Sequence, residues 1–200
     1  MNSNPSPRDA GIRDYIKSLQ RRDTALDKLN FVDKGQGTYL DSYTEAKFKD
    51  LCIATWKASS KPNQTAVQIL CYLRTLLDQL LGHFLLARGE DRRSAEVSDL
   101  HTFQFPDQGI TPCFPLIMTL NGSKNNQFGR LETMGAFRNK DPLICPLGAL
   151  GYYLLLRWDL TEEPFPDFTD RSRWYNTRLL LSAKDHQDVT AELSYSTQLD

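Results

Sequence analysis

Residues 89–100 read GEDRRSAEVSDL, and the pattern of the sequence changes on either side of this stretch. Before it, apolar residues recur at helical spacing, whereas after it short runs alternate between apolar and polar residues, as strands do. Positions i, i+3, i+4 and i+7 share one face of a helix, and here they hold Arg93, Glu96, Val97 and Leu100. A short helix is therefore predicted over 92–99, with an arginine at its start and a carboxylate one turn later.

The residues before position 89 are predicted to form three helices. An amphipathic helix is expected over 8–29, and a linker with two glycines follows at 33–37. A second helix is expected to begin near Asp41 and to end at Ser59. The third helix, over 64–88, has a wide apolar surface, which predicts a place at the centre of a helical bundle.

The residues after position 100 are predicted to form strands and helices in turn. Asn121-Gly122 is typical of a hairpin turn, and Pro146 suits the first turn of a helix, where its missing amide is not needed. Strands are expected over 101–105, 114–120, 127–137 and 178–181, helices over 146–158 and 192–200, and a loop over 161–178. This order predicts a mainly helical α+β fold in three parts, 1–37, 38–88 and 89–200.

Composition narrows the classes of protein to consider. The 200-residue chain has a formal net charge of −1, which excludes a uniformly basic, histone-like binder, so any contact with nucleic acid must come from a local patch. The most apolar stretch, 65–86, contains Gln68, Arg74, Asp78, Gln79 and His83, which argues against a membrane span.

The cysteines and histidines do not indicate a metal site. The four cysteines stand far apart and form no C-x-x-C pair: Cys52, Cys71, Cys113 and Cys145. They are predicted to be free, buried thiols in a reducing compartment rather than disulfides or zinc ligands. His83 lies in the apolar helix over 64–88 and is predicted to be structural. No metal or cofactor site is expected.

Basic residues gather between positions 121 and 140. Lys124, Arg130, Arg138 and Lys140 are opposed there by a single acidic residue, Glu132. Such a group can neutralise several phosphates, which makes DNA binding steeply dependent on salt. An ordinary solvated face is the alternative.

A second group of arginines lies among aromatic residues in the loop over 161–178. Arg171 and Arg173 precede Trp174 and Tyr175, an arrangement that suits phosphate contacts and base stacking. Aromatic residues in a loop also commonly fill the core beneath it, so both interpretations stay open.

Arg93, Glu96 and Lys124, in this order, resemble the first half of the active-site apparatus of tyrosine recombinases. In that family arginines hold two phosphate oxygens at once, and a hairpin lysine protonates the departing sugar hydroxyl. A histidine three residues before a second arginine, and a tyrosine nucleophile, come later. None of the chain's three histidines has an arginine at that spacing. The resemblance implies that Arg93 and Lys124 are relic positions and that the chain is not an enzyme. The plain alternative is that Arg93 pairs with Glu90 or Glu96.

Residues 138–154 read RNKDPLICPLGALGYYL and resemble a hallmark of one fungal group. That group is the second domain of the centromere DNA-binding kinetochore subunit, which has relatives among Crypton-type transposon recombinases. The resemblance runs from about 38 to 200 and is expected to cover only the N-terminal part of the domain. It implies a truncated tyrosine-recombinase-like fold, the fold of DNA breaking-rejoining enzymes, and a nuclear protein.

Three hypotheses follow from the sequence. The first is DNA binding, largely through backbone phosphates, by Arg93, Lys124, Arg130, Arg138, Lys140, Arg171 and Arg173. The second is the N-terminal part of an active Crypton-type recombinase, and the third is a helical protein-interaction module. Double-stranded DNA is the expected partner, with a second copy of the chain or other nuclear proteins as further candidates.

Overall fold

The computed structural model describes residues 14–15, 17–22, 43–107, 111–120, 131–182, 189–194 and 198. The chain divides into two compact units, Met1–Thr44 and Glu45–Asp200. In the first unit, residues 14–15 and 17–22 are helical, which agrees with part of the helix expected over 8–29. The linker expected at 33–37 lies outside the described residues.

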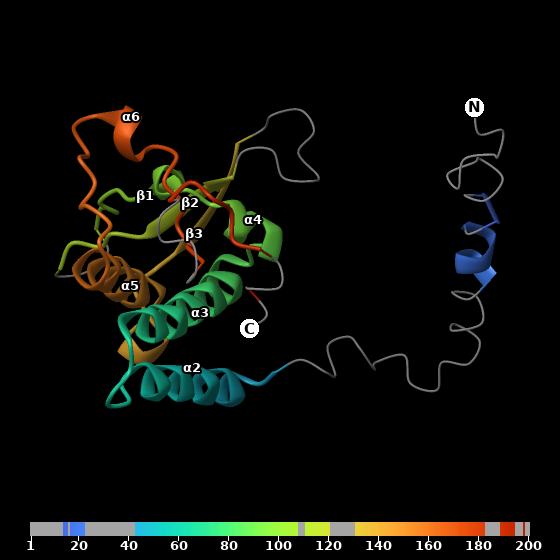
Figure 1. Cartoon of the computed structure of the whole chain (residues 1–200), viewed down its shortest axis with the longest axis horizontal. Helices are drawn as coiled ribbons and strands as arrows, with labels where there is room; N and C mark the ends of the chain where they lie inside the picture. The colour runs from blue at the N-terminus through green and yellow to red at the C-terminus, as the bar shows by residue number, and fades with distance from the viewer. Residues whose placement is uncertain are drawn as a thin grey trace, which may run out of the picture. The chain divides into compact units, whose positions relative to one another are not determined.

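The second unit begins with the helices α2 (Glu45–Ser59) and α3 (Ala66–Leu85), which pack against each other (Figure 1). Thr65 caps the start of α3: its hydroxyl accepts from the Gln68 amide, and the Gln68 side chain accepts from the Thr65 amide. This reciprocal arrangement satisfies two amides that the first turn leaves without a partner. Both predicted helices are confirmed, although α2 begins a few residues later than expected.

Helix α3 provides the centre of the core, as its apolar pattern predicts. It packs against both α2 and α5, and its buried leucines are Leu70, Leu73, Leu76, Leu77, Leu80, Leu81 and Leu85. Because each fully buried leucine contributes about 1.5–3 kcal/mol, this one helix supplies much of the apolar stabilisation.

A three-stranded antiparallel sheet, in the order β1-β2-β3, lies beside these helices. Its strands are β1 (Leu100–His101), β2 (Leu116–Leu120) and β3 (Glu132–Ala136). Alternate residues of β2 are buried, as expected for a strand with one face on the core. The strand predicted over 114–120 is confirmed at 116–120, and the one predicted over 127–137 at 132–136. Residues 121–130, with the Asn121-Gly122 turn, lie outside the described residues.

Helix α5 (Pro146–Leu160) follows the short helix η3 (Pro142–Ile144) and lies with α3 beside the sheet (Figure 1). Pro146 occupies its first turn, as predicted, and the Cys145 sulfur accepts a hydrogen bond from the Gly148 amide. The loop that follows α5 contains a short helix, α6 (Arg171–Trp174), which sequence reasoning missed. The described part of the chain is thus α+β.

The helix predicted over 92–99 is wrong. Helix α4 (Gly89–Ser94) ends at Ser94, and η2 (Val97–Asp99) begins after an extended Glu96, so Arg93 and Glu96 do not share a helix face. The Val97 amide donates to the Thr177 carbonyl at 2.8 Å, and the Leu179 amide donates to the Ala95 carbonyl at 2.9 Å. These hydrogen bonds come from far along the chain and replace those of a continued helix.

Two predicted strands are also shorter than expected. The 101–105 strand is reduced to β1 and a single bridge between Phe105 and Cys113. In place of a strand over 178–181 there is one bridge between Glu96 and Arg178. Residues 192–194 are not helical, whereas Gln198 is, and its amide donates to the Ser194 carbonyl at 3.1 Å. The helix predicted over 192–200 is therefore confirmed only in its later part. At Arg178 the pairing with distant Glu96 outweighs the local pattern.

Candidate nucleic-acid interface

Five of the seven basic residues singled out in the sequence lie among the described residues. They are Arg93, Arg138, Lys140, Arg171 and Arg173. Lys124 and Arg130 lie outside the described residues. The five are found on three different elements: α4, the segment after β3, and the loop around α6.

The side chain of Arg93 lies in a hydrogen-bond network at one end of α3. Arg93 donates to Gln198 Oε1 at 2.6 Å, and Gln198 Nε2 donates to both carboxylate oxygens of Asp78 at 3.0 and 3.1 Å. Arg92 donates to the same carboxylate from Nε at 2.6 Å and from Nη2 at 3.2 Å. Asp78 therefore accepts hydrogen bonds directly from Arg92, and Gln198 links it to Arg93.

Glu96, one of the two residues suggested as a partner of Arg93, forms an ion pair with a different arginine. Glu96 contacts Arg178, with 3.3 Å between Oε1 and Nη1, and Arg178 also donates to the Ser94 carbonyl. Glu96 thus links the residues after α4 to the segment around Arg178, because the extended backbone at position 96 turns it away from the α4 helix.

A basic surface runs where the segment after β3 crosses α2. Lys49 Nζ lies 2.5 Å from Asp141 Oδ2, and Trp56 Nε1 donates to the Leu143 carbonyl at 3.0 Å, so the segment follows α2 for two turns. Arg138 and Lys140 are exposed and form no ion pair within the described residues. These two residues, with Lys49 and the exposed Lys57 of α2, are called the basic seam; α2 also carries two acidic residues that act on Lys49, Glu45 and Asp50.

The one acidic residue of the crossing segment is already neutralised. The hydrogen bond from Lys49 lowers the pKa of Asp141, and the Leu143 amide donates to the same carboxylate and adds to the effect. Asp141 therefore stays charged and paired with Lys49, and it does not offset Arg138 or Lys140. Sequence reasoning missed Lys49, since only the contact between α2 and the segment around η3 brings it to Asp141.

Arg171 and Arg173 have a different environment. Arg173 lies 3.5 Å from Asp167 and 3.4 Å from Asp170, and all three side chains are exposed. Asp170 also caps α6, and hydrogen bonds from the Ser172 hydroxyl and amide lower the pKa of its carboxyl. Residues 157–175 contain five acidic residues against three arginines. This stretch is called the acidic loop.

The acidic loop is anchored by a buried ion pair. Arg157 and Glu163 meet at 2.6 Å with side chains that are 1% and 4% exposed. Arg157 also donates to the carbonyls of Arg178 and Leu179, and Trp158 Nε1 donates to Glu163. These contacts satisfy both charges in the interior, which is the condition for such a pair to be tolerated there.

The remaining candidate groups are structural. All four cysteines are free thiols, as predicted, but only Cys52 and Cys145 are buried, whereas Cys71 and Cys113 are partly exposed. Burial raises the pKa of Cys52 to about 11. His83 stacks on Phe48 with ring centroids 4.0 Å apart. Among the described residues no group of three or more His, Cys, Asp or Glu side chains is placed to hold a metal ion. Within the same residues, no helix has the length and apolar character needed to cross a membrane.

Comparisons with known proteins identify a family. Residues 1–199 match the family model described as the centromere DNA-binding protein complex CBF3 subunit, domain 2. No curated protein matches the chain. The match begins at residue 1, so it covers more of the chain than the resemblance seen in the sequence from about position 38. This chain belongs to the family of the centromere DNA-binding protein complex CBF3 subunit, domain 2.

Proposed function

We propose that this chain binds double-stranded DNA, largely through backbone phosphates, as a nuclear component of a centromere complex. The description of its family supports DNA binding and assembly with other subunits. The observation that carries the proposal is the basic seam, where Arg138 and Lys140 are exposed beside an acidic residue that Lys49 already neutralises.

The seam is suited to phosphates rather than to bases. An arginine can hold two phosphate oxygens through its planar guanidinium, whereas lysine acts as a point charge. Contacts of this kind position a protein on the duplex without reading its sequence. The net charge of −1 leaves the rest of the surface with little general attraction for DNA, so the seam sets where the duplex lies.

The proposal includes a tyrosine-recombinase-like ancestry, with lobes at 38–88 and 89–200 and relic positions at Arg93 and Lys124. The pairing of Arg93 with Gln198 supports a structural role for this arginine in the described state. The sequence offers no histidine with an arginine three residues later, so no strand cleavage is expected. Arg93 joins the seam as a DNA contact only if the duplex displaces Gln198.

Fluorescence anisotropy with a short duplex of arbitrary sequence, measured across a salt series, tests the proposal. Arg138→Ala combined with Lys140→Ala is expected to weaken binding and to reduce the salt slope by about 0.9 for each phosphate that is no longer neutralised. Arg171→Ala combined with Arg173→Ala is the matched control, since it removes the same charge from the acidic loop. Arg93→Ala reports separately on the relic position.

Three outcomes would count against this function. Equal weakening of binding in the seam variant and in the acidic-loop control would remove the seam as the DNA surface. Absence of binding at low salt, from a sample with native circular dichroism, would remove DNA binding altogether. A nicked or covalently attached duplex after incubation would overturn the assignment as a non-cleaving protein.

A further inference from the structure

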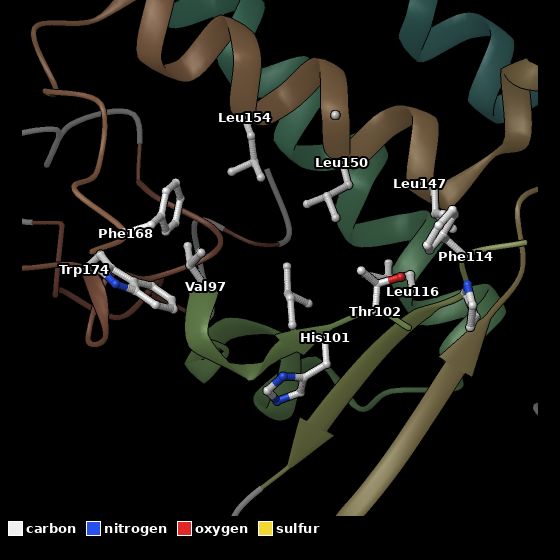
Figure 2. Close-up of a pocket in the computed structure, with 13 residues that line it drawn as sticks. Val97, His101, Thr102, Phe114, Leu116, Leu147, Leu150, Leu154, Phe168 and Trp174 are labelled. Carbon is white, nitrogen blue, oxygen red and sulfur yellow. The ribbon is translucent and has the colours of Figure 1, made fainter. Parts of the chain in front are cut away.

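A groove between α5 and β1 differs in character from the basic seam. It has a volume of about 520 Å³ and an almost wholly apolar lining. Figure 2 shows Leu147, Leu150 and Leu154 pointing from α5 towards the groove, with Phe168 and Trp174 at one end. Pockets that bind ligands or anchor residues commonly have about 300–1,000 Å³ and few polar groups. The size therefore suits one or two large side chains.

Trp174 lines the groove, and its side chain carries one indole nitrogen, Nε1. This Nε1 is buried and has no hydrogen-bond acceptor within the part of the chain that the structure describes. An indole N–H can only donate, and a buried donor without an acceptor costs about 1–3 kcal/mol. A bound group that brings a carbonyl oxygen to this position recovers that free energy.

The rim of the groove has the composition of a protein-binding surface. Phe114 and Phe168 line the groove and are each 46% exposed. Aromatic residues are enriched at protein interfaces, where they act as anchors around which other contacts assemble. β1 is an edge strand, and its outer side carries no further strand within the described ranges. An extended segment has room to lie along this edge.

The negative charge beside the groove favours a partner with basic residues. Phe168 and Trp174 belong to the acidic loop, where Asp159, Glu162 and Asp167 are exposed. Arg173 is paired with Asp167 and Asp170, and with all three arginines counted against the five acidic residues, the acidic loop keeps a net charge of −2. This environment repels a phosphate backbone and attracts lysine and arginine, since complementary charge steers association and excludes the wrong partner.

We propose that the groove binds an extended segment of a partner protein that has an apolar anchor next to basic residues. The anchor side chain enters between α5 and β1, a backbone carbonyl accepts from Trp174 Nε1, and the basic residues lie against the acidic loop. The groove and the basic seam are formed by different residues, so the proposal allows one chain to hold DNA and a protein at the same time.

The indole N–H resonances of the intact chain provide the test. The protein has three tryptophans, and a Trp→Phe change at each one assigns its signal in a nitrogen–proton correlation spectrum. The probes are short synthetic peptides with a central leucine or phenylalanine, flanked by lysines in one set and by glutamates in the matched set. The lysine set is expected to bind and to move the Trp174 signal downfield as a hydrogen bond forms.

Gly151 allows the groove to be blocked without harming the fold. It lines the groove on α5, and a Cβ built there meets nothing within 4 Å. Replacing a helical glycine by alanine stabilises the helix by about 0.5–1 kcal/mol, and circular dichroism of Gly151→Phe checks that weaker binding does not come from unfolding. Gly151→Phe is expected to weaken peptide binding about tenfold or more, as for a blocked anchor pocket. Gly151→Ala, the matched control, is expected to bind normally.

Several results would overturn the proposal. These are equal binding of both peptide sets, no movement of the Trp174 signal with either set, and unchanged binding by Gly151→Phe. A Trp174 shift caused by duplex DNA would assign the groove to nucleic acid instead. A shift that depends only on protein concentration would assign it to a second copy of the chain. The seam variant tests only duplex binding, and Gly151→Phe tests only peptide binding. The proposed function and this proposal can therefore be contradicted independently of each other.

Discussion

The basic seam and the acidic loop both carry exposed arginines, yet their surroundings give these arginines opposite roles. In the seam, Lys49 neutralises Asp141, and Arg138 and Lys140 have no ion pair among the described residues. In the acidic loop, two aspartates hold Arg173. The difference shows that a count of arginines along the sequence does not measure attraction for phosphate. The neighbours of each arginine decide it.

The two surfaces are also supported differently. The seam rests on regular packing, where α2 lies against α3 and η3. The acidic loop has little regular structure besides the last turn of α5 and the short helix α6, and it depends on the buried pair of Arg157 and Glu163. A single substitution should therefore disturb the loop more than the seam.

The largest expected effect comes from breaking the anchor of the acidic loop. Glu163→Gln leaves the charge of Arg157 buried without its partner, which should lower the free energy of unfolding by about 3–5 kcal/mol. Urea unfolding followed by circular dichroism measures the change. Asp167→Asn removes an exposed carboxylate of the same loop and should change stability by less than about 0.5 kcal/mol. Equal effects of the two variants would show that the buried pair is not the anchor.

Reversing the charge of the seam should have the next largest effect. Arg138→Glu combined with Lys140→Glu replaces two phosphate contacts by repulsion and should weaken duplex binding on the order of a hundredfold at low salt. The matched change at Arg171 and Arg173 should have a much smaller effect. Anisotropy titrations of both variants measure the difference. A larger effect from the acidic loop would reverse the assignment of the two surfaces.

A smaller effect should show how far the seam extends along α2. Lys57 lies one residue beyond Trp56, which contacts the segment after β3. Lys57→Ala should weaken duplex binding only a few-fold and reduce the salt slope by about 0.9, as for one phosphate. An unchanged slope would restrict the seam to the residues around Lys49 and Arg138.

The smallest effect concerns the buried side of α2 at high pH. The folded protein raises the pKa of Cys52 from 9.0 to about 11, so it holds the thiol proton more tightly than the unfolded chain does. This contribution to stability is fully present below pH 9 and is lost as the pH rises towards 11. Unfolding measured over this range should show a decline that Cys52→Ala reduces. Part of the decline should remain, because burial also raises the pKa of Tyr153.

Local patterns predicted α2, α3, β2, β3 and α5 because the residues that define them are close along the chain. The cap at Thr65 and Pro146 in the first turn of α5 are examples. The prediction failed over 92–99, where the backbone of Ala95 and Val97 pairs with residues 177–179. No helical or strand periodicity records that pairing, so the predicted common face of Arg93 and Glu96 did not form.

The sequence by itself determined the α+β class, the central apolar helix and the family, because these depend on periodicity and on an ordered set of residues. Only the tertiary structure decided which charges remain available. It joined Lys49 to Asp141 and Arg93 to Gln198, residues that are far apart along the chain. It also formed the groove between α5 and β1. The physical reason is that electrostatic and packing free energies depend on distance in space, which the folded chain sets.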